Sequence, residues 1–183
     1  MRRLAADDLI VSCQQGDRDA FRELFEMHKD RVYLIALHFT GNESTASDIV
    51  QQVFLKLLRD IGKFHFQAEF TTWLYRIVAN ACFDERRFWK RWVQYDSDAP
   101  EFDIVTTISP EANLANDEKI GEVMRAVNQL SPRLRMVVIL KYVEELSYLE
   151  IGRILGCSMG TVASRLNRAH KALAERLSHL QSS

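Results

Sequence analysis

The segment spanning residues 146–173 constrains the fold most, because it carries signals for two helices and one tight turn between them. Ser147 and Glu150 have the spacing of a capping box, in which the two side chains bind free backbone amides at a helix start. Gly156 predicts the end of that helix, since glycine readily adopts the left-handed conformation just past a C-terminus. Ser158 is a candidate N-cap for a second helix. The apolar stripe of this helix recurs at spacings of four, three and four residues and consists of Val162, Leu166, Ala169 and Leu173.

The opposite face of the second helix is polar and cationic. It presents Thr161, Ser164, Arg165, Asn167, Arg168 and Lys171. Hydroxyl, amide and cationic groups suit base edges and phosphates, and a helix-turn-helix places its second helix in the major groove of DNA. An ordinary helical hairpin with a solvated basic face would show the same local pattern. The segment therefore favours DNA binding, with a plain helical hairpin as the alternative.

The composition of the whole chain indicates an all-α protein. No Val-, Ile- or Thr-rich alternation bounded by turns predicts a strand, and only seven glycines and three prolines interrupt 183 residues that are 47% apolar. The three cysteines are far apart and have no metal-ligand spacing, which predicts a reduced cytoplasmic protein with no metal site or other cofactor. No run of eighteen uncharged apolar residues occurs and the N-terminus has no signal-peptide pattern, so neither membrane insertion nor export is expected.

Charge divides the chain into three parts. Residues 1–92 hold fourteen basic and thirteen acidic side chains, residues 93–118 hold seven acidic and no basic ones, and residues 119–183 hold ten basic and five acidic ones. Helical periodicity also lapses in the acidic stretch. We therefore expect a front domain over residues 1–92, a flexible acidic linker over 93–112 and a back domain over 113–183.

Small polar residues and glycines mark the expected helix boundaries. In the front domain, helix starts are predicted at Asp7 or Asp8, at Asp17, at Ser44 and at Thr71 or Thr72, and the first three helices are predicted to end at Gly16, near Phe39 and at Gly62. In the back domain, Ser109-Pro110 and Ser131-Pro132 each predict a helix start, since proline suits the first helical position. The apolar residues of the third helix cover more than one face, so this helix is either central in the fold or carries a docking surface for another protein.

Aromatic residues and cations lie on both sides of the fourth helix. The sequence KFHFQAEF at residues 63–70 is too polar and too rich in aromatic rings for a simple turn. The end of the helix alternates cations with rings in Arg86, Arg87, Phe88, Trp89, Lys90, Arg91 and Trp92. Arginine and aromatic rings together can hold phosphates and stack on unpaired bases, whereas a solvated helix end whose rings complete the core would give the same pattern.

Three segments follow one another along the chain: ASDIVQQVF at residues 46–54, FTTWLYRI at residues 70–77 with Asn80 and Asp84, and GTVASRL at residues 160–166 with Arg168 and Ala169. In this order they resemble the bacterial sigma factors of the extracytoplasmic-function (ECF) type, the minimal two-domain members of the sigma-70 family. The resemblance covers nearly the full chain. It implies two small helical domains, a sigma region 2-like front domain and a sigma region 4-like back domain with the helix-turn-helix, joined by the acidic linker.

The resemblance implies an alternative sigma factor for promoter-specific transcription initiation, and it assigns residues to three binding functions. The residues expected to contact the clamp of core RNA polymerase are Asp48, Gln51, Gln52, Phe54 and Leu55. The polymerase flap is a further expected contact. The residues expected to contact minus-10 promoter DNA are Phe64, His65, Phe66, Gln67, Asn80, Asp84, Arg86 and Arg87. One of the four loop residues at positions 64–67 is expected to capture a flipped base, and the sequence does not decide which one. The residues expected to contact minus-35 promoter DNA are Thr161, Ser164, Arg165, Asn167, Arg168 and Lys171. An anti-sigma protein that clasps both domains is the expected regulator, and an extracytoplasmic or stress signal is the expected stimulus.

Two positions depart from the family pattern. Ala163 stands where family members usually have Lys or Arg, which predicts weaker or altered reading of the minus-35 element. Gln52 stands where an acid is common, which changes the electrostatics of the polymerase contact.

Two other functions remain open at this point. A conventional repressor or activator would use the helix-turn-helix, dimerise through its front domain and bind an operator with two-fold symmetry. A sigma mimic would sequester an inhibitory protein and would be expected to lose its DNA-facing cations, yet Arg86, Arg87, Arg165 and Arg168 are all present. An enzyme is disfavoured, because the five histidines are scattered and no nucleophile has a recognisable base beside it.

Overall fold

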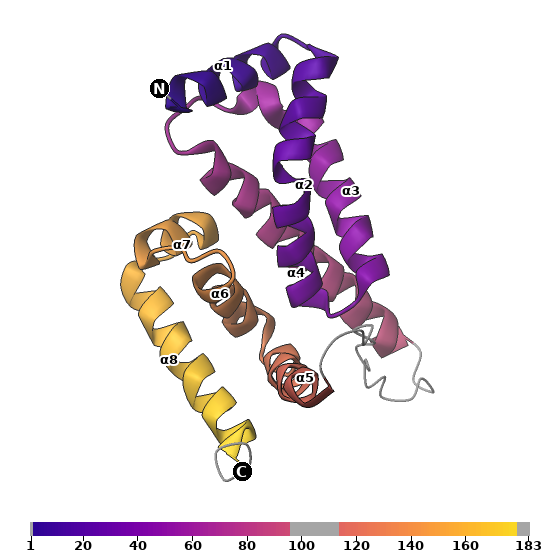
Figure 1. Cartoon of the computed structure of the whole chain (residues 1–183), viewed down its shortest axis with the longest axis vertical. Coiled ribbons are helices and arrows are strands. Elements are labelled where there is room, and N and C mark those ends of the chain that lie inside the picture. The colour runs from indigo at the N-terminus through magenta and orange to yellow at the C-terminus, as the bar shows by residue number, and fades with distance from the viewer. Residues whose placement is uncertain (1, 96–113, 179–183) are drawn as a thin grey trace.

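The computed structural model describes residues 2–95 and 114–178, with side chains described over residues 7–85 and 120–178. Regular structure in these ranges is entirely helical, which confirms the all-α prediction. The front half contains α1 (Arg2–Gln14), α2 (Arg18–Thr40), α3 (Glu43–Asp60), the 3-10 turn η1 (Ile61–Lys63) and α4 (Phe70–Tyr95). The back half contains α5 (Leu114–Asn128), α6 (Pro132–Tyr142), α7 (Tyr148–Leu155) and α8 (Met159–Arg176) (Figure 1).

In the front half, α2 and α3 form a hairpin against which α1 and α4 pack. Asp17 caps α2 as predicted, since its Oδ1 accepts hydrogen bonds from the amides of Asp19 and Ala20 at 2.9 and 3.1 Å. Gly41, with a φ of 68°, ends α2 in the left-handed conformation. The helices bury a shared core that includes Leu24, Ile35, Phe39, Ile49, Leu57 and Leu74.

The first and third helices begin at other residues than the sequence predicts. α1 begins at Arg2, so Asp7 and Asp8 lie inside the helix rather than at its start. α3 begins before Ser44, because Asn42 is its N-cap and accepts a backbone hydrogen bond of 2.9 Å through Oδ1. The α3 correction concerns two polar residues close to one another in sequence, Asn42 and Ser44, either of which can supply a capping oxygen.

The ends of the front half also differ. α3 ends at Asp60, and the chain passes through a 3-10 turn that contains Gly62. α4 begins at Phe70 rather than at Thr71 or Thr72, and it continues to Tyr95, past the domain end expected at residue 92.

In the back half, α6 contacts both α7 and α8. Its side chains Met136 and Leu140 are fully buried, together with Ile151 of α7 and Leu166 of α8. Ser131 precedes α6 as predicted, although its side chain makes no capping hydrogen bond. The helix start expected at Ser109-Pro110 lies outside the described residues.

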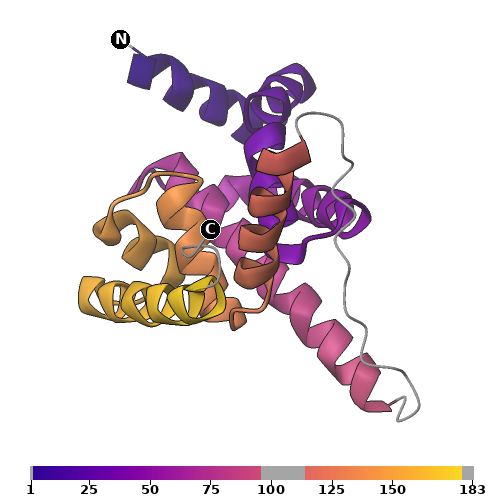
Figure 2. The same cartoon turned by 60° about the horizontal axis from the view of Figure 1, so that its bottom comes forward.

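The two halves pack against each other. α4 contacts α7, and α2 contacts both α6 and α5. One cluster of buried residues continues from the front half into the back half, and Figure 2 shows the helices of the two halves in contact. The sequence predicts two domains joined by a linker, and it does not predict this interface.

The three cysteines are free thiols, of which Cys13 and Cys82 are buried and Cys157 is half-buried. Burial raises the pKa of the Cys13 thiol, and it raises the pKa of Cys82 to about 12. In the part of the chain that the structure describes, no group of three His, Cys, Asp or Glu residues is arranged to hold a metal ion. None of the described helices is long and apolar enough to cross a membrane.

Candidate nucleic-acid interface and docking surface

The helix-turn-helix forms as the sequence predicts, with α7 as its first helix and α8 as its second. The amide of Ser147 donates to Glu150 Oε2 at 2.8 Å and the amide of Glu150 donates to Ser147 Oγ at 3.3 Å, which completes the capping box. The hydroxyl and the amide of Ser147 hold the pKa of Glu150 below its usual range. Gly156 ends α7 at a φ of 63°, and Ser158 Oγ accepts from the amide of Thr161 at 3.2 Å. Both helix ends that meet at the turn are therefore fixed by local hydrogen bonds.

The turn also requires glycine at position 152, inside α7. A Cβ atom placed on Gly152 would lie 2.6 Å from the carbonyl oxygen of Cys157. The amide of Cys157 donates to the carbonyl of Gly152 at 2.9 Å, so the two backbone segments are also hydrogen-bonded. Sequence reasoning missed this position, because a glycine inside a helical pattern acquires its meaning only when the backbone that approaches it is known.

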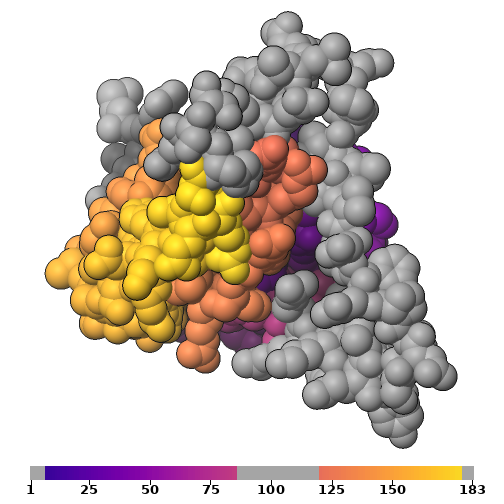
Figure 3. Space-filling model, turned by 90° about the horizontal axis from the view of Figure 1, so that it is seen from below, coloured from indigo at the N-terminus to yellow at the C-terminus, as the bar shows by residue number. Residues whose placement is uncertain are grey.

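The polar residues predicted to contact minus-35 DNA lie on one face of α8, whose surface is visible in Figure 3. Four of them, Ser164, Asn167, Arg168 and Lys171, are exposed, as is Ala163. The opposite face of α8 buries Val162, Leu166 and Ala169 against the rest of the back half. The helix therefore presents a polar and cationic surface from a well-packed scaffold.

Thr161 and Arg165 are partly buried, because each has a neighbour in the turn. The hydroxyl of Thr161 lies 3.0 Å from the hydroxyl of Ser158, and Arg165 Nη1 lies 3.6 Å from Cys157 Sγ. These contacts hold both side chains near the start of the helix, where a recognition helix meets base edges.

A stripe of exposed residues runs along α3 at a spacing of three to four residues. We call it the α3 stripe, and it consists of Asp48, Gln51, Gln52, Leu55 and Leu58. Leu55 is 62% exposed and Leu58 is 54% exposed. Exposed leucines beside carboxylate and amide groups are typical of a protein-binding surface. Leu58 was not assigned from the sequence, because its exposure depends on which faces of α3 the other helices cover.

Phe54, which the sequence assigned to polymerase contact, lies in the core instead. It is 5% exposed, and its ring packs edge-on against that of Phe25 of α2, with the ring centroids 4.6 Å apart. Because α2 covers this face of α3, Phe54 is not available to a partner protein. The correction leaves Asp48, Gln51, Gln52 and Leu55 as the accessible residues of the predicted contact.

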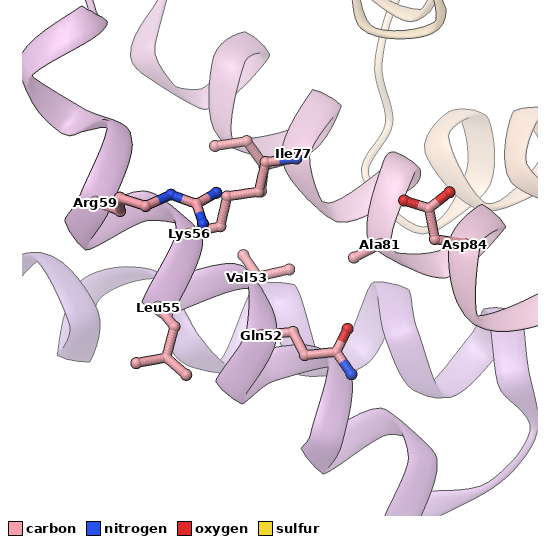
Figure 4. Close-up of a pocket in the computed structure, with 8 residues that line it drawn as sticks. All are labelled: Gln52, Val53, Leu55, Lys56, Arg59, Ile77, Ala81 and Asp84. Atoms are coloured by element: carbon pink, nitrogen blue, oxygen red, sulfur yellow. The ribbon is translucent and has the colours of Figure 1, made fainter. Parts of the chain in front are cut away.

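A groove with a volume of about 340 Å³ lies between α3 and α4, beside the α3 stripe (Figure 4). Its lining combines apolar and charged side chains and consists of Gln52, Val53, Leu55, Lys56, Arg59, Ile77, Ala81 and Asp84. The groove brings Gln52 and Leu55, assigned to the polymerase, next to Asp84, assigned to minus-10 DNA. Two sets of residues that the sequence treated separately thus share one surface.

Phe64 in the loop before α4 is 6% exposed and belongs to an aromatic cluster. Its ring centroid lies 4.9 Å from that of Phe66, 5.6 Å from that of Phe70 and 5.3 Å from that of Trp73. The ring is therefore not accessible to a nucleic-acid base, which corrects the prediction for Phe64.

The other three loop residues predicted to face DNA are exposed. Phe66 is 41% exposed, and His65 and Gln67 are exposed beside it. Phe66 has a φ of 56°, in the left-handed region that non-glycine residues rarely adopt. A bulky residue in this conformation costs backbone energy that the surrounding contacts must offset, and such strain is often found at ligand-binding sites.

Gln14 of α1 holds the start of this loop in place. Its Nε2 donates to the carbonyls of Ile61 and Phe64, at 3.0 and 2.8 Å. The ring centroid of His28 on α2 lies 5.5 Å from that of Phe70 in the same cluster, and burial lowers the pKa of His28. The sequence did not identify Gln14 or His28, because both act across large separations along the chain.

On α4, Asn80 and Asp84 are exposed, as the minus-10 prediction requires. The side chains of Arg86 and Arg87 lie outside the described residues, together with the alternating cations and rings that follow them.

These features define a two-part helical protein in which a helix-turn-helix packs on a domain that carries an exposed docking stripe. The chain matches Sigma-70 region 2 over residues 24–98 and Sigma-70, region 4 over residues 120–173. The two matches fall on the front half and on the back half of the fold. The chain belongs to the sigma-70 family and, within it, to the ECF RNA polymerase sigma factors.

Known relatives resemble this chain over almost its full length. It is 32% identical to the ECF RNA polymerase sigma factor SigW of Bacillus subtilis, over 93% of this chain and 96% of the relative. It is 31% identical to the ECF RNA polymerase sigma-E factor of Escherichia coli K12, over 94% of each chain. In fold, it is similar to the sigma factor RpoE of Bartonella quintana, solved in complex with the anti-sigma factor NepR, with a TM-score of 0.71 at 23% identity over 86% of this chain and 96% of that one. The comparisons confirm the resemblance stated from the sequence.

Proposed function

We propose that the protein is an alternative sigma factor that binds core RNA polymerase and directs it to specific promoters. The observation that carries this proposal is the presence, in one chain and in order, of region 2 on the front half and region 4 on the back half. The chain acts by binding and catalyses no reaction itself. Its place of action is the cytoplasm, where bacterial RNA polymerase works.

Binding to core polymerase falls to the α3 stripe. Leu55 and Leu58 supply apolar contact area, and Asp48, Gln51 and Gln52 supply hydrogen-bonding groups around them. Interfaces commonly concentrate their binding energy in such apolar anchors with a polar rim. The neighbouring groove between α3 and α4 extends this surface.

Phe66 captures a flipped minus-10 base. Its ring is exposed and packs against the buried ring of Phe64. A base can therefore stack on the Phe66 ring, which Phe64 holds in position. His65 and Gln67, on either side of it, offer hydrogen-bonding groups to the base edge. This narrows the four loop candidates to one stacking residue and two polar neighbours.

Reading of the minus-35 element falls to α8. Asn167 and Arg168 can contact base edges, and Ser164 and Lys171 can contact phosphates, while Thr161 and Arg165 act from the start of the helix. Ala163 adds no cation to this surface. We therefore expect the minus-35 element to contribute less binding energy than it does for a relative with Lys or Arg there.

The function is tested by transcription from purified components. Core polymerase with this chain is incubated with a library of promoter sequences, and transcript starts are mapped. We expect transcripts that share a minus-10 and a minus-35 element, and none with either component alone. No specific transcript from the whole library would contradict the proposal and would favour the sigma mimic.

The α3 stripe is tested with Leu55→Glu. Placing a charge at a central contact residue should weaken core polymerase binding by at least about tenfold, corresponding to roughly 1.4 kcal/mol. Met27→Glu on α2 is a matched control, because Met27 is an exposed apolar residue at 56% that is outside the stripe. Equal binding losses in the two variants would remove the stripe from the interface.

The stacking residue is tested with Phe66→Ala. Loss of one base–aromatic stack costs about 1–3 kcal/mol, so open-complex formation should fall by roughly 5- to 150-fold. His65→Ala is the neighbouring control and should lose less. If Phe66→Ala opens promoters as well as the wild type does, the base is held by another residue.

We also propose that an anti-sigma protein regulates the chain, since the α3 stripe is exposed apolar surface that an inhibitor can cover. The sigma factor RpoE of the similar solved structure is bound to such a protein. Co-purification from the native host in the absence of stress is the test, and a chain that is free of any partner under all conditions would contradict the proposal.

A further inference from the structure

Cys157 lies in the turn between α7 and α8, and its sulfur contacts the guanidinium of Arg165. Arg165 Nη1 lies 3.6 Å from Cys157 Sγ, a distance at which an N–H group donates to the large, weakly accepting sulfur atom. Both side chains are partly buried. Within the described residues, no carboxylate pairs with Arg165. The sulfur therefore holds the guanidinium without the loss of net charge that a carboxylate partner would bring.

The position of this sulfur is fixed by the backbone around it. The amide of Cys157 donates to the carbonyl of Gly152 in α7 at 2.9 Å, and its own carbonyl oxygen packs closely over the Cα of Gly152. The next residue, Ser158, caps α8 by accepting from the amide of Thr161 at 3.2 Å. Cys157 is thus held from both helices of the motif, and its side chain is a fixed point against which Arg165 can be oriented.

Arg165 differs in this respect from the other cations on the polar face of α8. Arg168 and Lys171 are exposed and contact no partner within the described residues. A long cationic side chain that is free in solution loses rotamer freedom when it binds, and this loss weakens binding. Arg165 has already lost part of that freedom in the free chain, so it is the preorganised cation of this face.

The contact with sulfur also determines which edge of the guanidinium remains available. A guanidinium carries five N–H donors in a rigid plane. Because Nη1 faces the sulfur, the neighbouring Nε–H and Nη2–H groups remain, and they point in the same direction. Two parallel donors match a pair of adjacent acceptors, such as O6 and N7 of a guanine or two oxygens of a phosphate.

A purely structural role for Cys157 makes different demands on the side chain. Cys157 directly precedes the N-cap Ser158, a position where an apolar residue often packs against the fourth residue of the helix, here the buried Val162. Such packing needs only an apolar side chain, whereas holding Arg165 needs an acceptor atom. Valine at position 157 satisfies the first demand alone, and serine satisfies the second alone.

We propose that Cys157 is a positioning residue for Arg165, whose Nε and Nη2 edge it presents to a pair of acceptors on minus-35 DNA. The orientation of Arg165 concerns the free chain, and the contact with DNA rests on the proposed function. Ala163 supplies no cation to the same helix, so binding depends more heavily on the cations that remain. Cys157 contributes to promoter recognition without contacting DNA itself.

The first test measures the mobility of Arg165 in the free chain by nitrogen-15 relaxation of its Nε–H group. In the wild type, Arg165 should have a higher order parameter than Arg168. Cys157→Val should lower the value for Arg165 to that of Arg168, and Cys157→Ser should keep it close to the wild-type value. Equal order of the two arginines in the wild type, or unchanged order of Arg165 in Cys157→Val, would overturn the proposal.

Promoter binding by the complex with core polymerase gives the second readout. On a promoter whose minus-35 element has been mapped, Cys157→Val should weaken binding by about 2- to 12-fold, as expected for ordering one freed side chain on binding. Cys157→Ser should bind more tightly than Cys157→Val. The opposite order of the two variants would show that Cys157 serves only to pack the turn, and it would overturn the proposal.

A double-variant cycle shows whether Cys157 acts through Arg165. In a chain that carries Arg165→Ala, Cys157→Val should cause no further loss of binding, because the residue through which it acts is gone. In a chain that carries Arg168→Ala, the matched control, the two losses should add, since the sulfur contacts Arg165 and not Arg168. Losses that add in the Arg165→Ala chain as well would overturn the proposal.

The same variants identify the acceptor pair. If Arg165 contacts a guanine, Arg165→Ala relaxes the sequence preference at one base pair of the minus-35 element, and Cys157→Val relaxes it at the same base pair. If Arg165 contacts a phosphate, Arg165→Ala weakens binding equally across sequences and lowers the salt dependence by about one unit of slope. Unchanged binding by Arg165→Ala would overturn the contact with DNA. A wild-type complex that binds no promoter would refute the proposed function, whereas relaxation in the free chain would still decide whether Cys157 orients Arg165.

Discussion

Gly152→Ala should destabilise the helix-turn-helix, although alanine is the better helix former. The added Cβ would lie 2.6 Å from the carbonyl oxygen of Cys157, which is backbone and cannot rotate away as a side chain would. Overpacking of this kind costs about 1–3 kcal/mol. The higher helix propensity of alanine returns about 1 kcal/mol. The net loss in the free energy of unfolding is therefore about 0–2 kcal/mol. We expect the upper half of this range, about 1–2 kcal/mol, because the amide of Cys157 is also bonded to the Gly152 carbonyl.

Gly121→Ala in α5 is the matched control. No atom lies within 4 Å of a Cβ placed on Gly121, so this variant should gain about 0.5–1 kcal/mol from helix propensity alone. Urea denaturation followed by circular dichroism measures both variants, and binding of duplex DNA with the mapped minus-35 element measures the recognition helix. The reasoning is refuted if Gly152→Ala is as stable as Gly121→Ala, because the turn would then yield at no cost.

Three further predictions concern the front half. Asp17→Ala removes the cap of α2 and should cost about 1 kcal/mol, whereas Asp19→Ala in the same turn should change the free energy of unfolding by less than about 0.5 kcal/mol in urea denaturation. Gln14→Ala removes two donors from the aromatic loop and should speed amide hydrogen exchange there, while Gln15→Ala, an exposed neighbour, should not; equal exchange in the two variants would contradict the role of Gln14. Burial lowers the folded-state pKa of His28, so its contribution to stability should be complete above the ordinary pKa of 6.5 and should be lost as pH falls through the folded value. His28→Gln should flatten this dependence between pH 7.5 and 5.5, and an identical slope would show that another group titrates.

Local signals in the sequence predicted the helix-turn-helix well. The capping box of Ser147 and Glu150, the left-handed Gly156 and the N-cap Ser158 all act over three or four residues. Each therefore depends little on the rest of the fold. The order of the helices and the polar face of α8 followed from the same short-range patterns.

The errors concern contacts between distant parts of the chain. Phe54 and Phe64 were assigned to partners because aromatic residues serve both cores and binding sites, and only the neighbouring rings show which applies. Glu144, between α6 and α7, accepts hydrogen bonds from Tyr75 of α4 and Arg31 of α2, which lie 69 and 113 residues away along the chain. No periodicity or short spacing carries information over such separations, so the interface between the halves was not predictable from the sequence.

The cysteines give the chain two internal probes of its own motions. Thiol reagents attack the thiolate, which is scarce at Cys82 because burial raises its pKa to about 12. Cys82 can therefore react only when the front half opens, whereas the half-buried Cys157 lies in the turn of the helix-turn-helix and is accessible sooner. Mass spectrometry of the alkylated wild-type chain would follow the two events separately. Alkylation of Cys82 would then time the opening of the front half, and alkylation of Cys157 that of the back half, during assembly with polymerase and without any engineered cysteine.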